Sequence, residues 1–272
     1  MNVYGLDAFS PSEIAERVKN VGVVKARLSF LKMSLLGVLA GGFIGLGSLY
    51  FVIVMSDPSF GFAAARVLGG VVFSLGLLLV VVAGAELFTG NNLLAMAWAS
   101  HLISTREMMR NWLIVCAANF VGASGLAVIV YLSGHAFLND GKIAEKIISI
   151  AAAKCVMSAS QLFWRGVLCN VLVCLAVWMA MAGRTVTDKF FAIVLPISAF
   201  VAAGFEHSIA NMYFIPLAML LKTDMTAVIA NSDQITWWNF ARNLAWVIPG
   251  NLLGGSVLVA LIYYVIYLRG EE

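Results

Sequence analysis

One of the three histidines, His207, lies deep within a long apolar stretch, whereas His101 and His135 fall in predicted loops. An imidazole in such a place can donate a proton or polarise a passing anion, because it titrates near neutral pH. A core histidine tied to a neighbouring carbonyl is the alternative interpretation. An ionisable side chain buried among apolar residues favours the functional one.

His207 belongs to one of two polar interruptions that share their spacing. The matching motifs are Gly84-x-Glu86-x4-Asn91 and Gly204-x-Glu206-x4-Asn211. This symmetry indicates a structural role for Glu86 and Glu206, since each carboxylate can accept hydrogen bonds from backbone N–H groups freed at a helix break. A proton-relay role for either glutamate is the second interpretation.

Other side chains around the two interruptions have either a functional or a purely structural interpretation. The Thr89 hydroxyl can donate to an anion or cap its own backbone. Asn170 faces a pore if its helix lines one, or else bonds to a neighbouring helix. Lys154 resembles a solvated cation at a membrane edge. Apolar side chains that are either core or pore constrictions excluding hydrated ions are Phe73, Leu77, Leu87, Phe88 and Phe200.

The composition shows what kind of molecule must position these residues. Of 272 residues, 62% are hydrophobic and only 11% are charged, against about 25% charged in a soluble domain. The mean hydropathy is +0.95. A water-soluble globule, a disordered chain and a nucleic-acid binder are therefore excluded, and the sequence predicts a polytopic membrane protein.

Six membrane crossings are expected. Four plain spans cover about 31–55, 111–133, 163–183 and 243–267, and two spans, about 66–100 and 189–221, are interrupted at 84–92 and 204–211. Before them, Ser10-Pro11-Ser12-Glu13 predicts a helix start, so residues 1–28 form an N-terminal segment that is either a packed or interfacial helix or a frayed tail. Ten Lys and Arg residues on one side against seven on the other predict that both termini are cytoplasmic.

The two halves of the pore domain (29–272) repeat each other. The break motifs match at an offset of 120 residues. Asn111, Asn119, Gly122 and Ser124 match Asn243, Asn251, Gly254 and Ser256 at an offset of 132. A weaker match at an offset of 133 pairs Phe30-x-Lys32-x2-Leu35 with Phe163-x-Arg165-x2-Leu168.

Each half therefore holds three spans, about 29–133 and 162–268. Because three is odd, the second half enters from the opposite side. The expected fold class is an all-α polytopic membrane protein of six transmembrane helices in two inverted three-helix repeats, with the second and fifth helices broken, a pattern typical of transport pathways. Asn91, Asn119, Asn211 and Asn251 are expected to be structural polar groups at the breaks.

Several segments resemble the formate–nitrite transporter family over nearly the whole chain. They are LFTG (87–90), NVLVCLAVWM (170–179), GFEHSIANM (204–212) and the PGNLLGG run around Asn251. The resemblance implies an aquaporin-like inverted-repeat fold, although the chain has no NPA motif. It also implies a homopentamer in a bacterial or archaeal cytoplasmic membrane, with one pore per protomer that passes small monovalent anions or their conjugate acids.

The resemblance also implies residue roles. His207 would be the central pore histidine and Thr89 the threonine of a flexible loop, Lys154 would draw anions into a vestibule, and Glu206 and Asn170 would support the histidine and lysine regions. The apolar residues given above would form the constrictions. The run GRTVTDKFFAIVLP (183–196) resembles the formate branch.

Formate, passing passively or with a proton, is therefore the expected substrate, and nitrite or hydrosulfide is the alternative. A more distant alternative is an intramembrane redox enzyme in which His207 and the glutamates bind a metal or quinone. One embedded histidine and no CxxC spacing disfavour it. No enzyme activity, cofactor or metal is expected.

Overall fold

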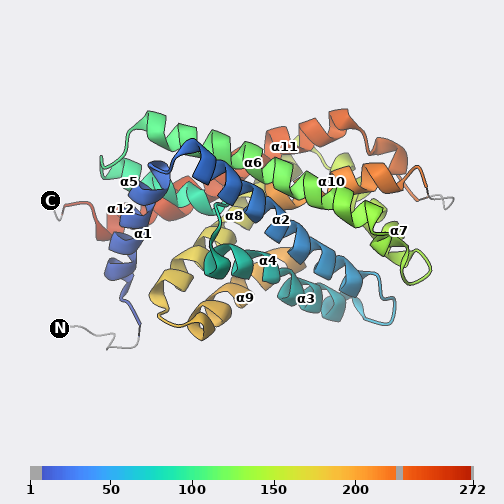
Figure 1. Ribbon diagram of the computed structural model, residues 1–272. Coiled ribbons are helices and arrows are strands. Elements are labelled where there is room, and N and C mark those ends of the chain that lie inside the picture. The colour runs from blue at the N-terminus through green and yellow to red at the C-terminus, as the bar shows by residue number, and fades with distance from the viewer. Residues whose placement is uncertain (1–7, 225–228, 271–272) are drawn as a thin grey trace.

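The computed structural model describes residues 8–224 and 229–270, and within those ranges every regular element is a helix (Figure 1). The first half comprises α1 (Pro11–Ala26), α2 (Phe30–Met55), α3 (Phe62–Phe73), α4 (Leu75–Leu78), η1 (Leu79–Gly84), η2 (Gly90–Leu93), α5 (Leu94–Ala99) and α6 (Thr105–Leu132). The second half comprises η3 (His135–Phe137), α7 (Lys142–Val156), α8 (Ala159–Ala182), α9 (Val186–Ala202), α10 (Ser208–Leu221), η4 (Ser232–Gln234), α11 (Trp237–Leu252), η5 (Leu253–Leu261) and α12 (Ile262–Tyr267).

Six crossings are present, as the sequence predicts. Among the described residues, five continuous helical stretches are long and apolar enough to span a membrane: Phe30–Met55, Phe62–Gly84, Thr105–Leu132, Ala159–Ala182 and Trp237–Tyr267. Helices α9 and α10 have 17 and 14 residues and are each too short alone. Together, with the break between them, they make the sixth crossing.

The N-terminal segment is a packed helix. Ser10 caps α1 in a capping box with Glu13, and Pro11 occupies the first helical position. The backbone N–H and the hydroxyl of Ser10 hold the pKa of Glu13 below its ordinary value. Ile14 and Val18 are buried against the bundle, which selects the packed helix over the frayed tail.

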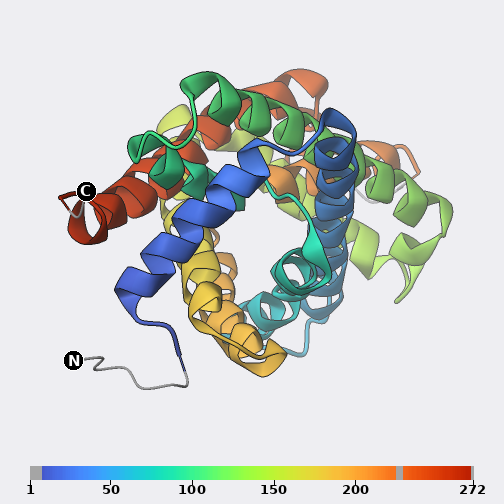
Figure 2. The ribbon, with the colours of Figure 1, turned by 60° about the vertical axis from the view of Figure 1, so that its left-hand side comes forward.

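The arrangement of the helices is that of an inverted repeat. Helices α1 and α12 lie at one end of the molecule and α7 lies at the opposite end (Figure 1). The second view shows α1 running across its end of the bundle (Figure 2). Helices α2 and α6 pack closely at Gly41, where the absence of a side chain allows the approach. A Cβ added there would overlap the Asn119 carbonyl.

Candidate functional site: two helix breaks around a buried imidazole

Both broken helices end in the same way. Gly84 and Gly204 have φ values of +88° and +72°, in the left-handed region that glycine adopts most easily. Just beyond, Ala85 donates its N–H to the Val80 carbonyl at 3.0 Å. Phe205 donates in the same way, at 3.1 Å, to the carbonyl five residues before it. After each of these bonds the backbone is non-helical until the next helix begins, η2 in the first half and α10 in the second.

Asn119, on α6, satisfies the backbone freed in the first break. Its Oδ1 accepts the N–H of Phe88 at 2.9 Å. Its Nδ2 donates to the carbonyls of Gly37 at 2.8 Å and Glu86 at 2.9 Å. A buried backbone group without a partner would be unfavourable by about 1–3 kcal/mol, so this amide makes the break possible.

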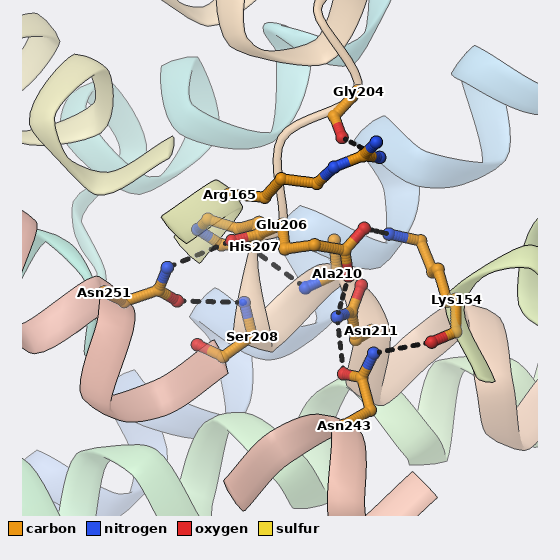
Figure 3. Close-up of polar contacts among 10 residues, drawn as sticks. All are labelled: Lys154, Arg165, Gly204, Glu206, His207, Ser208, Ala210, Asn211, Asn243 and Asn251. Carbon is orange, nitrogen blue, oxygen red and sulfur yellow. Dashed lines mark hydrogen bonds and ion pairs between the residues drawn. The ribbon is translucent and has the colours of Figure 1, made fainter. Parts of the chain in front are cut away.

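Asn251 makes the corresponding contacts in the second break (Figure 3). Its Oδ1 accepts the N–H of Ser208 at 3.1 Å. Its Nδ2 donates to the carbonyls of Gly166 at 2.8 Å and Glu206 at 3.0 Å. Both asparagines are fully buried. Asn119 and Asn251 therefore make equivalent contacts at the two breaks.

A lysine–glutamate–asparagine network lies beside each break. In the first half, Lys25 Nζ is 3.0 Å from Glu86 Oε1 and donates to Asn91 Oδ1 at 2.9 Å. Asn91 Nδ2 donates to Glu86 at 2.7 Å and to Asn111 at 2.9 Å. Asn111 Nδ2 donates to the Lys25 carbonyl at 3.1 Å, which completes the network.

The second network repeats the first almost bond for bond (Figure 3). Lys154 Nζ donates to Glu206 Oε1 at 2.7 Å. Asn211 Nδ2 donates to Glu206 at 2.7 Å and to Asn243 at 2.8 Å. Asn243 donates to the Lys154 carbonyl at 3.2 Å. Each buried carboxylate is thus neutralised by a lysine, and the lysine–glutamate pair is the same in both networks.

Lys25 is a site residue that was not among the candidates expected from the sequence. Its match with Lys154 shows that α1 corresponds to α7, so the repeat extends beyond the three spans of each half. A signal does exist in the sequence: Lys25-x3-Ser29 and Lys154-x3-Ser158 share their spacing, and both serines cap the following helix.

The weak match between the first spans of the two halves differs from the structure by four residues, about one helical turn. The Glu86 N–H donates to the Leu36 carbonyl, and the Glu206 N–H donates to the Arg165 carbonyl, both at 3.2 Å. Leu36 therefore corresponds to Arg165. The sequence match had instead paired Lys32 with Arg165, because their charges stand out among interchangeable apolar residues.

Thr89 and His207 meet between the two breaks, with Thr89 Oγ1 3.0 Å from His207 Nε2. The Ala210 N–H donates to His207 Nδ1 at 3.1 Å. Nδ1 must therefore carry the lone pair, and the neutral ring holds its proton on Nε2. In this arrangement Nε2–H donates to Thr89, and the threonine hydroxyl keeps its own proton for another acceptor.

Asn170 ties the two breaks together. Its Nδ2 donates to Asn92 Oδ1 and to the Asn251 carbonyl, both at 2.7 Å, and lies 3.2 Å from the Thr89 carbonyl. Its side chain is fully buried and lines neither cavity described below. Of the two interpretations of Asn170, the contacts match the bond between neighbouring helices.

Two cavities reach the breaks from opposite ends. The α1 cavity, of about 320 Å³, is lined by Lys25 on α1 and by the first break. The α7 cavity, of about 290 Å³, is lined by Lys154 on α7 and by the second break, His207 included. None of the described residues lines both cavities, and the buried Thr89–His207 contact lies between the two breaks. Each cavity is large enough for a small anion with water.

Four of the five apolar residues proposed as constrictions line one of the two cavities. Leu77 and Leu87 line the α1 cavity. Phe73 and Phe200 line the α7 cavity and pack edge to face at 5.7 Å between ring centroids. Phe200 also stacks on the His207 ring at 5.9 Å. Phe88 is buried and lines neither cavity.

A family model and the similar proteins of known sequence point to the same family. A family model described as "Formate/nitrite transporter" matches residues 12–265. The chain is 38% identical over 276 residues to "Formate channel FocA" of Escherichia coli (strain K12), covering 98% of this chain and 97% of that protein.

Solved structures agree with the sequence comparison. A structure described as "Pentameric formate channel with formate bound" superposes with a TM-score of 0.80 at 37% identity, covering 88% of this chain and 98% of that one. The aquaglyceroporin from Plasmodium falciparum superposes with a TM-score of 0.53 at 15% identity, over 88% of this chain and 98% of that one. The second likeness confirms the aquaporin-like fold alone.

Proposed function

Because the chain belongs to the formate/nitrite transporter family, we propose that it conducts formate across the membrane through a pathway in each protomer. The observation that carries this proposal is the geometry of the breaks. Each break bounds a cavity with a lysine, and the two cavities approach the Thr89–His207 contact from opposite ends.

The first step is recruitment of the anion. Lys25 and Lys154 each present an ammonium group to a cavity while pairing with a buried glutamate. A lysine held in this way attracts a monovalent anion without trapping it, because its charge is already shared with the carboxylate. The matched networks support recruitment from both ends.

The second step is loss of water at the apolar residues. Moving a bare anion into an apolar constriction such as Leu77 and Leu87, or Phe73 and Phe200, is unfavourable by several kcal/mol even after relaxation. Burial raises the proton affinity of a carboxylate. The neutral acid, or an anion sharing a proton, therefore crosses more easily than the free anion.

His207 supplies the hydrogen bond at the centre. Its Nε2–H, now directed at Thr89, is placed to turn to an arriving anion, and the Thr89 hydroxyl offers a second donor. A charged imidazolium would set Nδ1–H against the Ala210 N–H. This geometry favours a shared proton at Nε2, with the transported proton arriving with the substrate, over outright protonation by His207.

Assembly and placement follow from the same premise. A solved relative is described as a pentameric formate channel, and we propose a homopentamer for this chain. Its strongly exposed apolar side chains, such as Leu132 and Leu195, then face lipid or neighbouring protomers. We place α1 and α12 at the cytoplasmic face of a bacterial or archaeal cytoplasmic membrane, in line with the excess of Lys and Arg there.

The choice of anion is tested by flux. Purified protein in liposomes is given formate, nitrite, acetate and hydrosulfide in turn, at matched pH and ionic strength. We expect formate to be the fastest. Faster flux of nitrite or hydrosulfide would assign the pathway to that anion instead, and equal rates with protein-free liposomes for all four would reject transport.

The family is one of channels and transporters, and we propose that the chain has no enzymatic activity. Within the described ranges, no group of three His, Cys, Asp or Glu side chains is placed to hold a metal ion. Metal and quinone analysis of the purified protein tests the redox alternative. A stoichiometric bound metal or quinone would revive it.

The two lysines are expected to act on their own sides. Lys154→Ala should raise the half-saturating formate concentration for entry from the α7 cavity by about threefold to tenfold, corresponding to roughly 1 kcal/mol of lost attraction. Lys25→Ala should do the same from the α1 cavity. The measurement is the initial rate of uptake into liposomes of known orientation. A fall in maximal rate at unchanged half-saturation would argue against recruitment.

Thr89→Val keeps the shape of the side chain and removes the hydroxyl that meets His207. We expect formate flux to fall by about twofold to tenfold, the effect of one neutral hydrogen bond, with the protein still folded. Thr89→Ser restores a hydroxyl and should restore most of the rate in the same uptake assay. Wild-type flux in the valine variant would remove Thr89 from the pathway.

A further inference from the structure

The two cavities differ in charge although their networks match. Among the residues that the structure describes, four cations line the α7 cavity, Arg66, Lys146, Lys154 and Arg165, together with the single carboxylate of Glu206. The α1 cavity is lined by one cation, Lys25, and one carboxylate, Glu86. With every group ionised, the formal charges are therefore +3 and 0. A cavity with unbalanced positive charge attracts anions more strongly than a balanced one.

One repeat position accounts for part of this difference. Leu36 and Arg165 correspond, because each presents its carbonyl to the N–H of the glutamate at its break, at 3.2 Å. Both residues line their cavities. The same place in the fold thus carries an isobutyl group at one end and a guanidinium at the other. The network of Lys154, Glu206 and their asparagines does not need the guanidinium, since the first half builds its copy with leucine.

Arg66, on α3, reaches the same spot as Arg165. Arg165 Nη1 donates to the Gly204 carbonyl at 3.4 Å (Figure 3). Arg66 Nη1 lies 3.6 Å from the position that a Cβ on Gly204 would take. The two guanidinium groups therefore approach the lip of the second break from different helices, beside the cavity.

Neither guanidinium is neutralised. No carboxylate in residues 8–224 or 229–270 forms an ion pair with Arg66 or Arg165. The one carboxylate that lines the cavity, Glu206, is already bonded to Lys154 and Asn211. Each guanidinium presents five N–H donors in a planar fork, which matches both oxygens of a carboxylate.

We propose that Arg66 and Arg165 form an anion-binding subsite at the lip of the second break, which takes a planar monovalent oxyanion of the carboxylate class. The anion rests there before it passes to Lys154 and His207. This inference rests on the proposed function for its place in transport, but not for binding itself. With this subsite present, entry from the α7 cavity saturates at a lower formate concentration than entry from the α1 cavity.

Binding is tested without transport by phenylglyoxal, which modifies free guanidinium groups. Purified wild-type protein is treated in formate or in chloride at the same ionic strength, and modification of each arginine peptide is followed by mass spectrometry. We expect formate to slow modification of Arg66 and Arg165 several-fold and to leave the exposed Arg106 unaffected. Equal rates in the two salts at Arg66 and Arg165 would overturn the proposal, whether or not the chain conducts formate.

The role in transport is tested by Arg165→Leu, which copies the residue at the corresponding position of the first half. We expect the half-saturating formate concentration for entry from the α7 cavity to rise by about threefold to tenfold, with little change in maximal rate. Arg165→Lys keeps the charge but loses the fork, so it should recover only part of the effect.

Arg106→Leu, at an exposed position on the first turn of α6, is the matched control and should behave as wild type. A wild-type half-saturating concentration in Arg165→Leu would overturn the transport role. Absence of formate flux in the wild type would instead reject the proposed function, and the phenylglyoxal result would still decide whether the subsite exists.

Discussion

His207→Phe is expected to lower formate uptake into liposomes by about tenfold to hundredfold, because it removes the one imidazole that can share a proton with the anion between the two cavities. A hydrogen bond to a charged group contributes about 1.5–3 kcal/mol, which corresponds to that range of rates. Phenylalanine keeps the aromatic ring against Phe200, whose centroid lies 5.9 Å from that of His207. The measurement is the initial uptake rate between pH 5 and pH 8.

This variant also removes the acceptor for the Ala210 N–H, so a second variant separates folding from transport. His207→Asn can still accept that N–H, but it lacks the Nε2–H directed at Thr89. Both variants should assemble and both should lose flux. His101→Asn is the control, since His101 is exposed and its φ of +57° suits asparagine. Wild-type uptake in both His207 variants would eliminate the imidazole from the mechanism.

Asn251→Leu is expected to destabilise the protein more than any other single change considered above. It leaves the buried Ser208 N–H and the Glu206 carbonyl without their partner, and each such group is unfavourable by about 1–3 kcal/mol. We expect a lower melting temperature, a smaller yield of assembled protein and loss of formate flux. Differential scanning fluorimetry in detergent measures the first of these.

Asn119→Leu should give a similar loss, because Asn119 makes the equivalent contacts at the first break. Asn20→Leu is the control: Asn20 is exposed on α1 and should leave the melting temperature nearly unchanged. If Asn251→Leu melted like Asn20→Leu, the claim that one buried amide holds each break open would be wrong.

Much of the fold follows from the sequence because polar residues are rare in this chain. The spacing of Glu86 and Asn91 against Glu206 and Asn211, and of Asn119 against Asn251, marks both breaks and their inverted relation. Six crossings and an aquaporin-like fold are confirmed. These features can be predicted because backbone N–H and C=O groups freed inside a membrane need hydrogen-bond partners within the protein, and polar residues at matching positions supply them.

Other features depend on tertiary contacts that spacing does not reveal. Lys25 lies far along the chain from Glu86, and only the packing of α1 across its end brings them to 3.0 Å. The face that Asn170 presents depends on the orientation of α8, and its bonds to Asn92 and Asn251 turn it away from both cavities. The sequence match paired Arg165 with Lys32 and not with Leu36. Apolar spans contain few distinctive residues by which two segments can be aligned.

Simultaneous measurement of formate and proton entry into liposomes holding the wild-type protein tests the central claim most directly. A formate gradient is imposed without a pH gradient, and internal formate and internal pH are followed together against protein-free liposomes. The account predicts saturable entry of about one proton per formate, faster as the pH falls, since the substrate crosses with its proton shared at a single imidazole. Electrogenic formate entry without protons, or entry no faster than in protein-free liposomes, would contradict it.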